Sequence, residues 1–471
     1  MQKNNIGIIG LAVMGRSLAL NMADHGFHVG GYNRSYEVTK RLLQEEPNKN
    51  FQGYETIKEL VDSLSSPRKL MLMVKAGDTV DSIIEQLLPF LGEGDIIMDG
   101  GNSYFQDTIR RERYLKEKGI LFFGVGVSGG EEGARFGPSI MPGGDQEAYQ
   151  QIRPILERIS AKSEDKKDCC AYIGENGAGH YVKMVHNGIE YADMQIISEA
   201  YLMLKHVGHF SNRELARVFK GYSEGRLNSF LIEITANIFE EIEEDTQMNL
   251  IDLIQDASSQ KGTGKWTSEE AMHLGVDVSM ITSSYLARVM SNDENKEKAH
   301  TLFATSMKDG NVNKEALIKQ VEEGMYAAKI IAYAQGFDLL KHAAEYYHWK
   351  LSFDEIASIF RAGCIIRASF LEEIMKAYKE EPTLSHLLFH EYFSKCIQQD
   401  KDSLRTLCAN AILQGIPIPS LSSAITYLDM LSSAHVGANL IQAQRDYFGA
   451  HTFRRVDKEG SFHHDWGKHH A

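Results

Sequence analysis

Five polar residues near the middle of the chain have the types and the spacing that acid–base chemistry needs. They are Lys183, His186, Asn187, Glu190 and Tyr191. On an α-helix these positions lie at i, i+3, i+4, i+7 and i+8, and therefore on one face. Such a face is either a solvated helix surface or the wall of a catalytic site. The catalytic interpretation is favoured by the apolar residues that would bury much of the remaining circumference, namely Val182, Met184, Val185, Ile189 and Ala192.

A second chemical candidate is the glycine-rich segment that runs from Gly124 to Gly130, at the end of a predicted strand. Its glycines would let a ligand approach the backbone closely. Backbone N–H groups and the hydroxyl of Ser128 can hold a carboxylate or a hydroxyl group. We therefore take Ser128, Gly129 and Gly130 as candidate substrate-binding residues.

The chain opens with a strand, a tight turn and the start of a helix, between Ile6 and Gly15. The spacing is that of Gly-x-Gly-x-x-Gly, with Ala12 in place of the second glycine. Gly10 would allow the tight turn, and Gly15 the close packing of helix on strand. Backbone N–H groups at the helix start would then face phosphates. The motif predicts a dinucleotide site made by Gly10, Leu11, Ala12, Val13, Met14 and Gly15.

The end of the second predicted strand indicates which dinucleotide is bound. An acidic residue there would bind the ribose 2′-hydroxyl of NAD. This chain instead has Asn33, Arg34 and Ser35 after Tyr32. No carboxylate repels a 2′-phosphate, and the Arg34 guanidinium can bind one through paired charge-assisted hydrogen bonds. The segment favours NADP over NAD.

Two further strand ends supply candidates, because ligands sit at the carboxyl ends of strands in open α/β sheets. The third predicted strand ends in Val74-Lys75-Ala76-Gly77, and the fourth in Asp99-Gly100-Gly101-Asn102-Ser103. We assign Val74, Lys75 and Ala76 to the cofactor. Asn102 would contact the nicotinamide or the substrate, with a turn-forming role as the alternative.

The remaining candidates carry less information in sequence alone. The segment from Gln260 to Trp266 has Gly and Lys residues that suit an anion, but it lacks the spacing of a phosphate loop, so NTP binding is not supported. Arg288, Arg445 and His451 stand alone, and their positions by themselves predict no function. No cluster of ligand residues demands a metal ion.

The elements that position these residues follow from the apolar pattern. Strands and helices alternate in the first third of the chain, which predicts βαβ units and a doubly wound, mostly parallel sheet. The predicted strands are Ile6–Ile9, Phe27–Tyr32, Leu70–Val74, Ile96–Met98 and Leu121–Val127. From Tyr181 to about Leu431 the chain is helix after helix. We expect a Rossmann domain (1–177), an all-helical domain (178–431) and a C-terminal tail (432–471) whose apolar and aromatic groups pack on another surface.

The helical region repeats itself. Segments of the first copy recur in the second, at an offset of 134 residues at first and of 140 to 141 residues further along. The matching pairs are 196–200 with 330–334, 211–219 with 352–360, Arg226 with Arg367, and 229–231 with 369–371. One copy therefore carries an insertion of about two helical turns. Internal duplication is the favoured cause, and chance similarity of two amphipathic helices is the alternative.

Composition excludes several classes of protein. The 471 residues include 50 basic and 64 acidic side chains, for a net charge of −14. This argues against general binding to nucleic acid or to an anionic membrane, although a local basic cluster can still bind a small anion. No apolar run approaches the roughly 20 residues of a spanning helix, and the start lacks a signal-peptide layout. Five cysteines without metal spacing indicate reduced thiols, and we expect a cytoplasmic protein.

At these motifs the chain resembles the 6-phosphogluconate dehydrogenases, the decarboxylating enzymes of the pentose phosphate pathway, over essentially its whole length. The matching blocks are 10–15, 33–35, 99–103, 128–130, 183–191, 260–266 and 443–451. One departure is Ser259, where the family usually has Gly or Ala. It is a small change that should not reduce activity.

The resemblance implies an activity and roles for the residues. The activity is the oxidative decarboxylation of 6-phosphogluconate to ribulose 5-phosphate and carbon dioxide, with reduction of NADP. Lys183 would be the general base and Glu190 the general acid. The sugar acid's carboxylate and hydroxyls would be held by Ser128, Gly129, Gly130, His186 and Asn187. Its phosphate would be held by Tyr191, Lys261, Arg288 and Arg445, with His451 close by.

The resemblance also implies a homodimer. The duplicated helical domain would form most of the interface, and the C-terminal tail would reach the partner subunit. Arg445 and His451 would then complete the site of the other subunit.

Two other functions compete with this one. Other β-hydroxyacid dehydrogenases, such as those for 3-hydroxyisobutyrate, share the Ser-Gly-Gly and Lys motifs but are shorter and lack the duplicated helical domain. A catalytically silent NADP-binding protein should have lost Lys183 or Glu190, and both are present. The sequence leaves open whether NAD is also accepted, and whether the enzyme serves the pentose phosphate route or gluconate use.

Overall fold

The chain forms two compact units, Met1–Ala424 and Ile425–Ala471. The computed structural model describes residues 2–305 and 312–467. The three predicted domain ranges also include residues 1, 306–311 and 468–471, which lie outside the described residues. The predicted boundaries at 177 and 431 stay predictions.

The N-terminal part of the first unit is built on one sheet, which has seven strands among the described residues, in the order β3-β2-β1-β4-β5-β6-β7. Strands β1 to β6 run parallel, and β7 pairs antiparallel with β6. The strands are β1 (Ile6–Ile9), β2 (Val29–Tyr32), β3 (Phe51–Tyr54), β4 (Lys69–Leu72), β5 (Ile96–Asp99), β6 (Leu121–Ser128) and β7 (Ser139–Gly143). The first six follow the doubly wound order of dinucleotide-binding domains, so the predicted fold class is confirmed.

The sequence did not predict β3 and β7, and both lie at edges of the sheet. Strand β3 has only four residues, Phe-Gln-Gly-Tyr, with a glycine that weakens the strand pattern. Strand β7 contains Pro142, which cannot donate to a ladder. An edge strand tolerates proline because one of its sides has no neighbouring strand.

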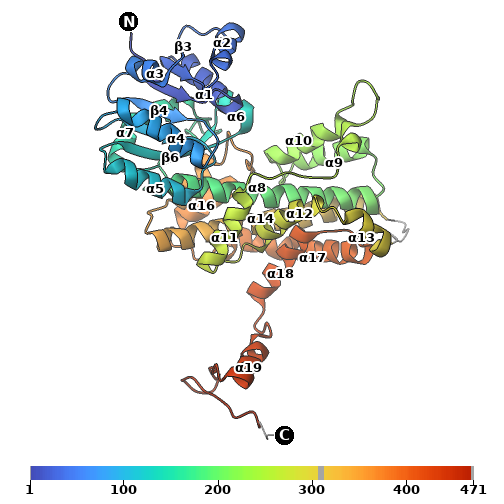
Figure 1. Cartoon of the computed structure of the whole chain (residues 1–471). Helices are drawn as coiled ribbons and strands as arrows, with labels where there is room; N and C mark the ends of the chain where they lie inside the picture. The colour runs from blue at the N-terminus through green and yellow to red at the C-terminus, as the bar shows by residue number, and fades with distance from the viewer. Residues whose placement is uncertain (1, 306–311, 468–471) are drawn as a thin grey trace. The chain divides into compact units, whose positions relative to one another are not determined.

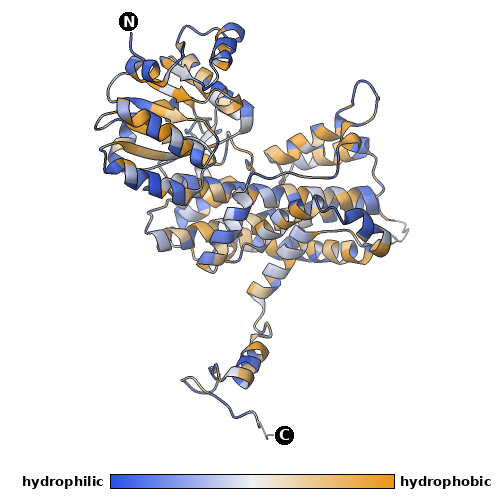
Figure 2. Ribbon diagram, in the orientation of Figure 1, coloured by the Kyte–Doolittle hydropathy of each residue, from blue (hydrophilic) through white to orange (hydrophobic). Residues whose placement is uncertain are grey.

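Helices cover both faces of this sheet (Figure 1). Alternate strand residues supply the two cores: Ile8 and Met98 belong to one, and Ile9 and Leu72 to the other. Figure 2 shows the apolar strands between helices whose outer surfaces are more polar. These helices are α1 (Val13–Asp24), α2 (Tyr36–Glu45), α3 (Ile57–Ser63), α4 (Asp78–Leu87), α5 (Phe105–Lys116), α6 (Gly130–Phe136) and α7 (Gln146–Ile159).

The rest of the first unit is helical, as predicted. Its longest helices, α8 and α14, pack against each other and are buried over much of their length. The helices are α8 (Ala178–Leu202), α9 (Asn212–Ser223), α10 (Phe230–Glu240), α11 (Thr263–Leu274), α12 (Ser279–Ser291), α13 (Lys296–Phe303), α14 (Lys314–Tyr347), α15 (Phe353–Ile359), α16 (Leu371–Glu380) and α17 (Glu391–Gln414). Helix α18 (Pro419–Ser432) begins in this unit and ends in the second. Among the described residues, no helix has the length and apolar character needed to cross a bilayer.

The two sequence repeats form equivalent helices. The first copy contains α8, α9 and α10, and the second contains α14, α15 and α16. The copies meet at equivalent points, where Ser229 forms an antiparallel bridge with Ala368. Helix α8 ends at Leu202 and continues as a π-helical turn to Val207, whereas α14 continues to Tyr347. The predicted two-turn insertion is therefore a C-terminal extension of α14.

The second unit is organised around one buried carboxylate. Asp446, on α19 (Ala438–Gly449), is fully buried and accepts hydrogen bonds from the Thr452 N–H at 2.9 Å and from the Trp466 indole N–H at 2.8 Å. The segment between these residues folds back on itself through mutual backbone hydrogen bonds of Phe453 and Phe462. A single acidic side chain thus ties the helix to the segment that follows it.

Candidate active site

The loop after β1 has the geometry that its glycines predict. Gly10 has φ +96°, and a Cβ there would lie 2.4 Å from the Met73 carbonyl oxygen. A Cβ on Gly15 would lie 1.8 Å from the Gly10 carbonyl oxygen. Ala12 precedes α1 and provides no side-chain cap. The backbone N–H groups in the first turn of α1, around Val13 and Met14, can therefore turn to an anion.

The loop after β2 packs beside this turn. The Asn33 side-chain oxygen accepts a hydrogen bond from the Leu11 N–H at 3.0 Å, which ties the two loops together. Arg34 is exposed and forms no hydrogen bond or ion pair with any described residue. Ser35 precedes α2 without capping it through its side chain. The Arg34 side chain therefore has no partner among the described residues and can bind an anion beside the β1 turn.

The ends of β4 and β5 continue the same edge of the sheet. Val74 and Ala76 are half-buried after β4, while Lys75 is exposed. After β5, the buried Asp99 carboxylate accepts hydrogen bonds from the Gly101 N–H at 3.0 Å and the Ser103 hydroxyl at 2.6 Å. Asp99 shapes this turn and leaves Asn102 exposed between its two partners, with no hydrogen bond to any described residue.

Glycines let the backbone of α8 pack directly against the backbone of the sheet. A Cβ on Gly126, in β6, would lie 2.6 Å from the Lys183 Cβ. A Cβ on Gly179, in the first turn of α8, would lie 2.4 Å from the Gly124 carbonyl oxygen. This close contact places Lys183 beside the carboxyl end of β6, where Ser128 is the last residue.

The polar face of α8 meets that strand end through a relay of hydrogen bonds. The His186 Nε2 lies 3.1 Å from the Ser128 hydroxyl, and its Nδ1 lies 3.1 Å from the Asn187 side-chain oxygen. Since an amide oxygen only accepts, Nδ1 donates to Asn187 and Nε2 accepts from Ser128. The Glu190 carboxylate lies 4.0 Å from the same Nδ1. Gly129 and Gly130 follow at the start of α6.

Burial sets the charges of this face. Lys183 is 6% exposed, and its burial lowers the pKa of the amine from 10.5 to about 8. Burial also raises the pKa of Glu190, against the opposing effect of Lys183. Burial and the nearby Lys183 keep the pKa of His186 well below its ordinary value, so that imidazole is neutral. The face is therefore not a solvated surface, because its lysine and histidine are buried and their proton affinities lowered.

A cationic cluster lies one turn further along α8. The Arg288 guanidinium, from α12, stacks on the Tyr191 ring with Cζ 3.6 Å from the centroid. The Tyr191 hydroxyl oxygen accepts a hydrogen bond from the backbone N–H of Lys261 at 3.4 Å, and the Lys261 side chain is close enough to lower the pKa of Glu190. The Asn187 amide donates to the Thr263 hydroxyl at 3.4 Å and holds the start of α11 against α8. The structure thus brings Lys261 and Arg288 to the end of the polar face opposite Lys183, where they can bind an anionic group.

Comparison with known proteins assigns the chain to a family. The sequence profile described as "NAD binding domain of 6-phosphogluconate dehydrogenase" matches residues 5–174. The profile described as "6-phosphogluconate dehydrogenase, C-terminal domain" matches residues 179–466. The chain belongs to the 6-phosphogluconate dehydrogenase family.

Individual members of the 6-phosphogluconate dehydrogenase family match over their full length. The NADP⁺-dependent, decarboxylating enzyme of Bacillus subtilis (strain 168) is 53% identical over 470 residues, which are 99% of this chain and 100% of that protein. The decarboxylating enzyme of Escherichia coli (strain K12) is 50% identical over 467 residues, with the same coverage. The Plasmodium falciparum enzyme, solved in its apo form, with NADP⁺ and with 6-phosphogluconate, has a TM-score of 0.94 and 44% identity, covering 98% of this chain and 100% of that one.

The remaining predicted site residues of this family member belong to the second unit. Arg445 lies on α19, is exposed and donates to the Gln442 side-chain oxygen at 3.1 Å. His451 is exposed just after α19, with its ring 5.8 Å from that of Phe448. The site described above is made by the first unit alone.

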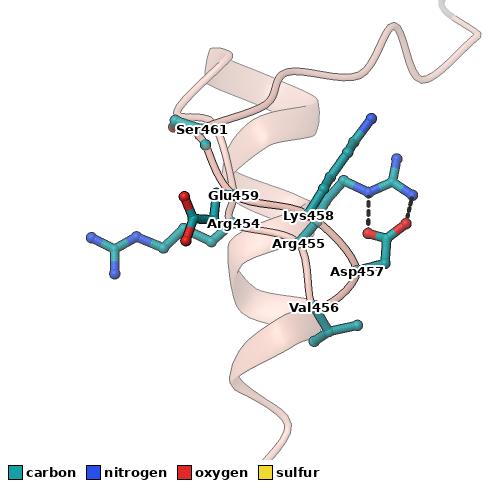
Figure 3. Close-up of a pocket in the computed structure, with 8 residues that line it drawn as sticks. Arg454, Arg455, Val456, Asp457, Lys458, Glu459 and Ser461 are labelled. Atoms are coloured by element: carbon teal, nitrogen blue, oxygen red, sulfur yellow. Dashed lines mark hydrogen bonds and ion pairs between the residues drawn. The ribbon is translucent and has the colours of Figure 1, made fainter.

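The second unit also has a surface hollow, on the loop between Phe453 and Phe462. It is lined by residues 454–461, and Arg455 forms two hydrogen bonds of 2.7 Å with Asp457. Figure 3 shows Arg454 and Lys458 pointing in different directions. The hollow therefore does not form a convergent binding site.

Sequence reasoning missed the loop that closes the site beside Ser128. The Phe360 ring lies edge-on to His186, with centroids 5.2 Å apart. Cys364 is buried, its thiol lies 3.0 Å from the Phe360 carbonyl oxygen, and burial raises its pKa to about 12. It is therefore a thiol, not a thiolate. This loop lies far from the α8 face in sequence and has no motif, so no sequence signal could have found it.

Proposed function

We propose that this chain catalyses the NADP-dependent oxidative decarboxylation of 6-phosphogluconate to ribulose 5-phosphate and carbon dioxide. The observation that carries the proposal is the buried Lys183, whose amine has a pKa of about 8 and lies between the coenzyme loops and a cationic cluster. The relatives from Bacillus subtilis and Escherichia coli are decarboxylating 6-phosphogluconate dehydrogenases. The full-length match and the site geometry agree on the same reaction.

The substrate would lie along the α8 face, with the coenzyme reaching its Lys183 end from the loops at the carboxyl ends of the strands. The coenzyme residues would be 10–15, 33–35, 74–76 and Asn102, with Arg34 holding the 2′-phosphate. The sugar acid's carboxylate and hydroxyls would be held by Asn102, Ser128, Gly129, Gly130, His186 and Asn187. Its phosphate would be held by Tyr191, Lys261 and Arg288. Bound NADP would supply the acceptor for the hydride that leaves C3 of the sugar acid.

Lys183 would perform the first proton transfer. A neutral amine takes the proton of the C3 hydroxyl as that carbon is oxidised. The product of oxidation is a β-keto acid, and the new lysine cation lies beside its ketone oxygen. This positive charge stabilises the negative charge that builds on the oxygen as carbon dioxide leaves.

Glu190 would perform the second proton transfer. Loss of carbon dioxide leaves an enediol, which needs a proton at C1. Because burial raises the pKa of Glu190, its carboxyl group can hold a proton and donate it to that carbon. Lys183 gives its proton to the enediol oxygen as carbon dioxide leaves, and takes it back as C1 is protonated and the ketone of ribulose 5-phosphate forms. Transfer of this proton from Lys183 to Glu190 then restores both groups for the next cycle.

The test is a turnover assay with 6-phosphogluconate, in which NADP and NAD are compared and released carbon dioxide is measured. We expect NADPH formation with one carbon dioxide per NADPH. Reduction without carbon dioxide would indicate another β-hydroxyacid dehydrogenase, and no reduction in a folded protein would indicate a silent binding protein. Arg34→Ala should weaken NADP binding by roughly 10- to 100-fold and leave NAD binding nearly unchanged; equal losses would contradict the 2′-phosphate role.

We also propose a cytoplasmic homodimer in which the tail acts on the partner subunit. The domains would be 1–177, 178–431 and 432–471, and the enzyme would serve the pentose phosphate route or gluconate use. Arg445 and His451 would complete the phosphate site of the other subunit. Apolar side chains exposed on α19 support this, including Leu440 at 62% and Phe448 at 69%.

Mixed dimers separate action on the partner from action within one chain. One parent would be Lys183→Met and the other Arg445→Ala. If the tail acts on the partner, one site of each mixed dimer has both residues, and mixing restores activity. If Arg445 serves its own chain, no site has both, and mixing two inactive parents restores nothing.

A further inference from the structure

The two-turn extension of α14 breaks the duplication, and its residues contact the coenzyme domain. The extension ends at Tyr347, and Trp349 follows after one residue. The indole N–H of Trp349 donates to the Asn176 side-chain oxygen at 3.0 Å, in the segment before α8. The first copy has no counterpart, because α8 and its π-helical turn end at Val207. The extension is therefore not part of the structure that the two copies share, and its contacts are with the coenzyme domain.

Its aromatic rings surround Phe105, the first residue of α5. Phe105 is fully buried, with its ring 5.4 Å from that of Tyr347, 6.2 Å from that of Trp349 and 4.8 Å from that of Tyr181. Tyr347 and Trp349 stack on each other at 4.7 Å. Phe105 follows Asn102 by three residues, so these rings fix the end of the segment that presents Asn102 to the coenzyme.

The same extension binds α11, which begins beside the predicted phosphate site. The Tyr347 hydroxyl donates to the Glu270 carboxylate at 3.0 Å. Glu270 is 3% exposed, and its other oxygen lies 3.4 Å from the Gln106 amide on α5. Trp266, also on α11, packs its ring 5.2 Å from that of Tyr104. The Glu270 carboxylate therefore joins α11 both to α5, through Gln106, and to the extension, through Tyr347.

We propose that Tyr347 and Trp349 are positioning residues that hold the Asn102 segment at a fixed separation from α11, and so hold the coenzyme in register with the phosphate end of the substrate. Neither residue needs to touch a reactant. Hydride transfer depends on a near-attack distance, and a misplacement of about 1 Å can cost roughly 100-fold in rate. The inference rests on the proposed function, because it concerns how the coenzyme and the substrate of that reaction are positioned relative to each other.

The test compares Trp349→Leu and Tyr347→Phe with the control Tyr346→Phe in the full-length protein. Tyr346 is the preceding residue on the same helix, is 55% exposed, and its hydroxyl lies 3.2 Å from the ring of the exposed His273 on α11. Tyr346→Phe therefore removes a surface hydrogen bond between α14 and α11 while it keeps the ring contact with Tyr347. We expect kcat to fall roughly tenfold in Trp349→Leu and roughly threefold in Tyr347→Phe, with the control unchanged. The separate Kd values of NADP and 6-phosphogluconate should change less than about twofold in all three.

A second readout separates positioning from mere stability. With substrate deuterated at C3, the isotope effect on kcat should rise in Trp349→Leu, because hydride transfer becomes rate-limiting. Trp349→Phe keeps the stacking and should recover most of kcat. Variants that turn over like the control, or that lose activity only in proportion to unfolded protein, overturn the inference while wild-type turnover upholds the proposed function. A wild-type protein that does not turn over overturns both.

Discussion

The two long helices of the repeat use equivalent positions for opposite purposes. On α8, the five positions of the polar face hold Lys183, His186, Asn187, Glu190 and Tyr191. At the repeat offset, the same positions on α14 hold Leu317, Gln320, Val321, Gly324 and Met325. Four of these five α14 residues are buried, and α14 packs on α17.

The difference shows what burial achieves in each copy. On α14 it removes apolar surface from water, which stabilises the fold. On α8 the same burial falls on ionisable groups and changes their pKa values instead. The α8 face therefore gives up stabilisation to gain reactivity, and the α14 face supplies the stability that the domain needs.

The largest effect should come from making α8 resemble α14. Lys183→Met replaces the base with an apolar side chain of similar length, so kcat should fall by about 10⁴-fold. NADP affinity should stay nearly intact, and the free energy of unfolding should not decrease, because a buried amine is removed. Turnover assays, NADP titration and urea unfolding would measure these, with exposed Lys265→Met as the control. Wild-type turnover in Lys183→Met would contradict the assignment of Lys183 as the base.

The converse change on α14 should affect stability alone. Met325→Ala opens a cavity at a fully buried position and should lower the free energy of unfolding by about 2–5 kcal/mol. Urea unfolding measures the loss, and kcat per folded molecule should stay as in the wild type. A fall in kcat as large as that of Lys183→Met, in fully folded protein, would contradict the division between the helices.

Glu190→Gln should lower kcat by roughly 100-fold, because an amide cannot donate the C1 proton as an acid does. It should also raise stability. Burial raises the pKa of Glu190, so the ionised carboxylate destabilises the folded state above that pKa, and the cost disappears as pH falls below the unfolded value. The gain in Glu190→Gln should therefore grow with pH in unfolding experiments between pH 4 and 8. A gain in stability that does not change with pH would contradict the raised pKa of Glu190.

The mildest perturbation is a change of pH with the wild-type protein. Lys183 must be neutral, and its pKa is about 8, so kcat/KM for 6-phosphogluconate should rise about tenfold per pH unit below that value and then level off. Initial rates at saturating NADP would measure the profile. A flat profile from pH 6 to 8 would mean that no group of this pKa is the base.

The sequence predicted those parts of the site that lie on periodic elements. The α8 face repeats at helical spacing, and the coenzyme loops follow apolar strands, so both could be placed before the structure. Cys364 and Tyr347 could not be, because they reach the site and the coenzyme domain through contacts between segments far apart in the chain. The insertion was visible as a change of offset, but its location in α14 and its contact with Phe105 depend on tertiary packing. The edge strands β3 and β7 were not predicted, because a glycine in β3 and a proline in β7 weaken their strand patterns.

The central claim is that burial on α8 makes Lys183 a base near neutral pH. Its pKa can be measured directly by carbon-13 NMR of lysine labelled at Cε, with the resonance assigned by its absence in Lys183→Met. A resonance that titrates near pH 8 is the predicted result. A titration near 10.5, the ordinary value for lysine, would show that the α8 face is no more reactive than a solvated surface and would contradict the account.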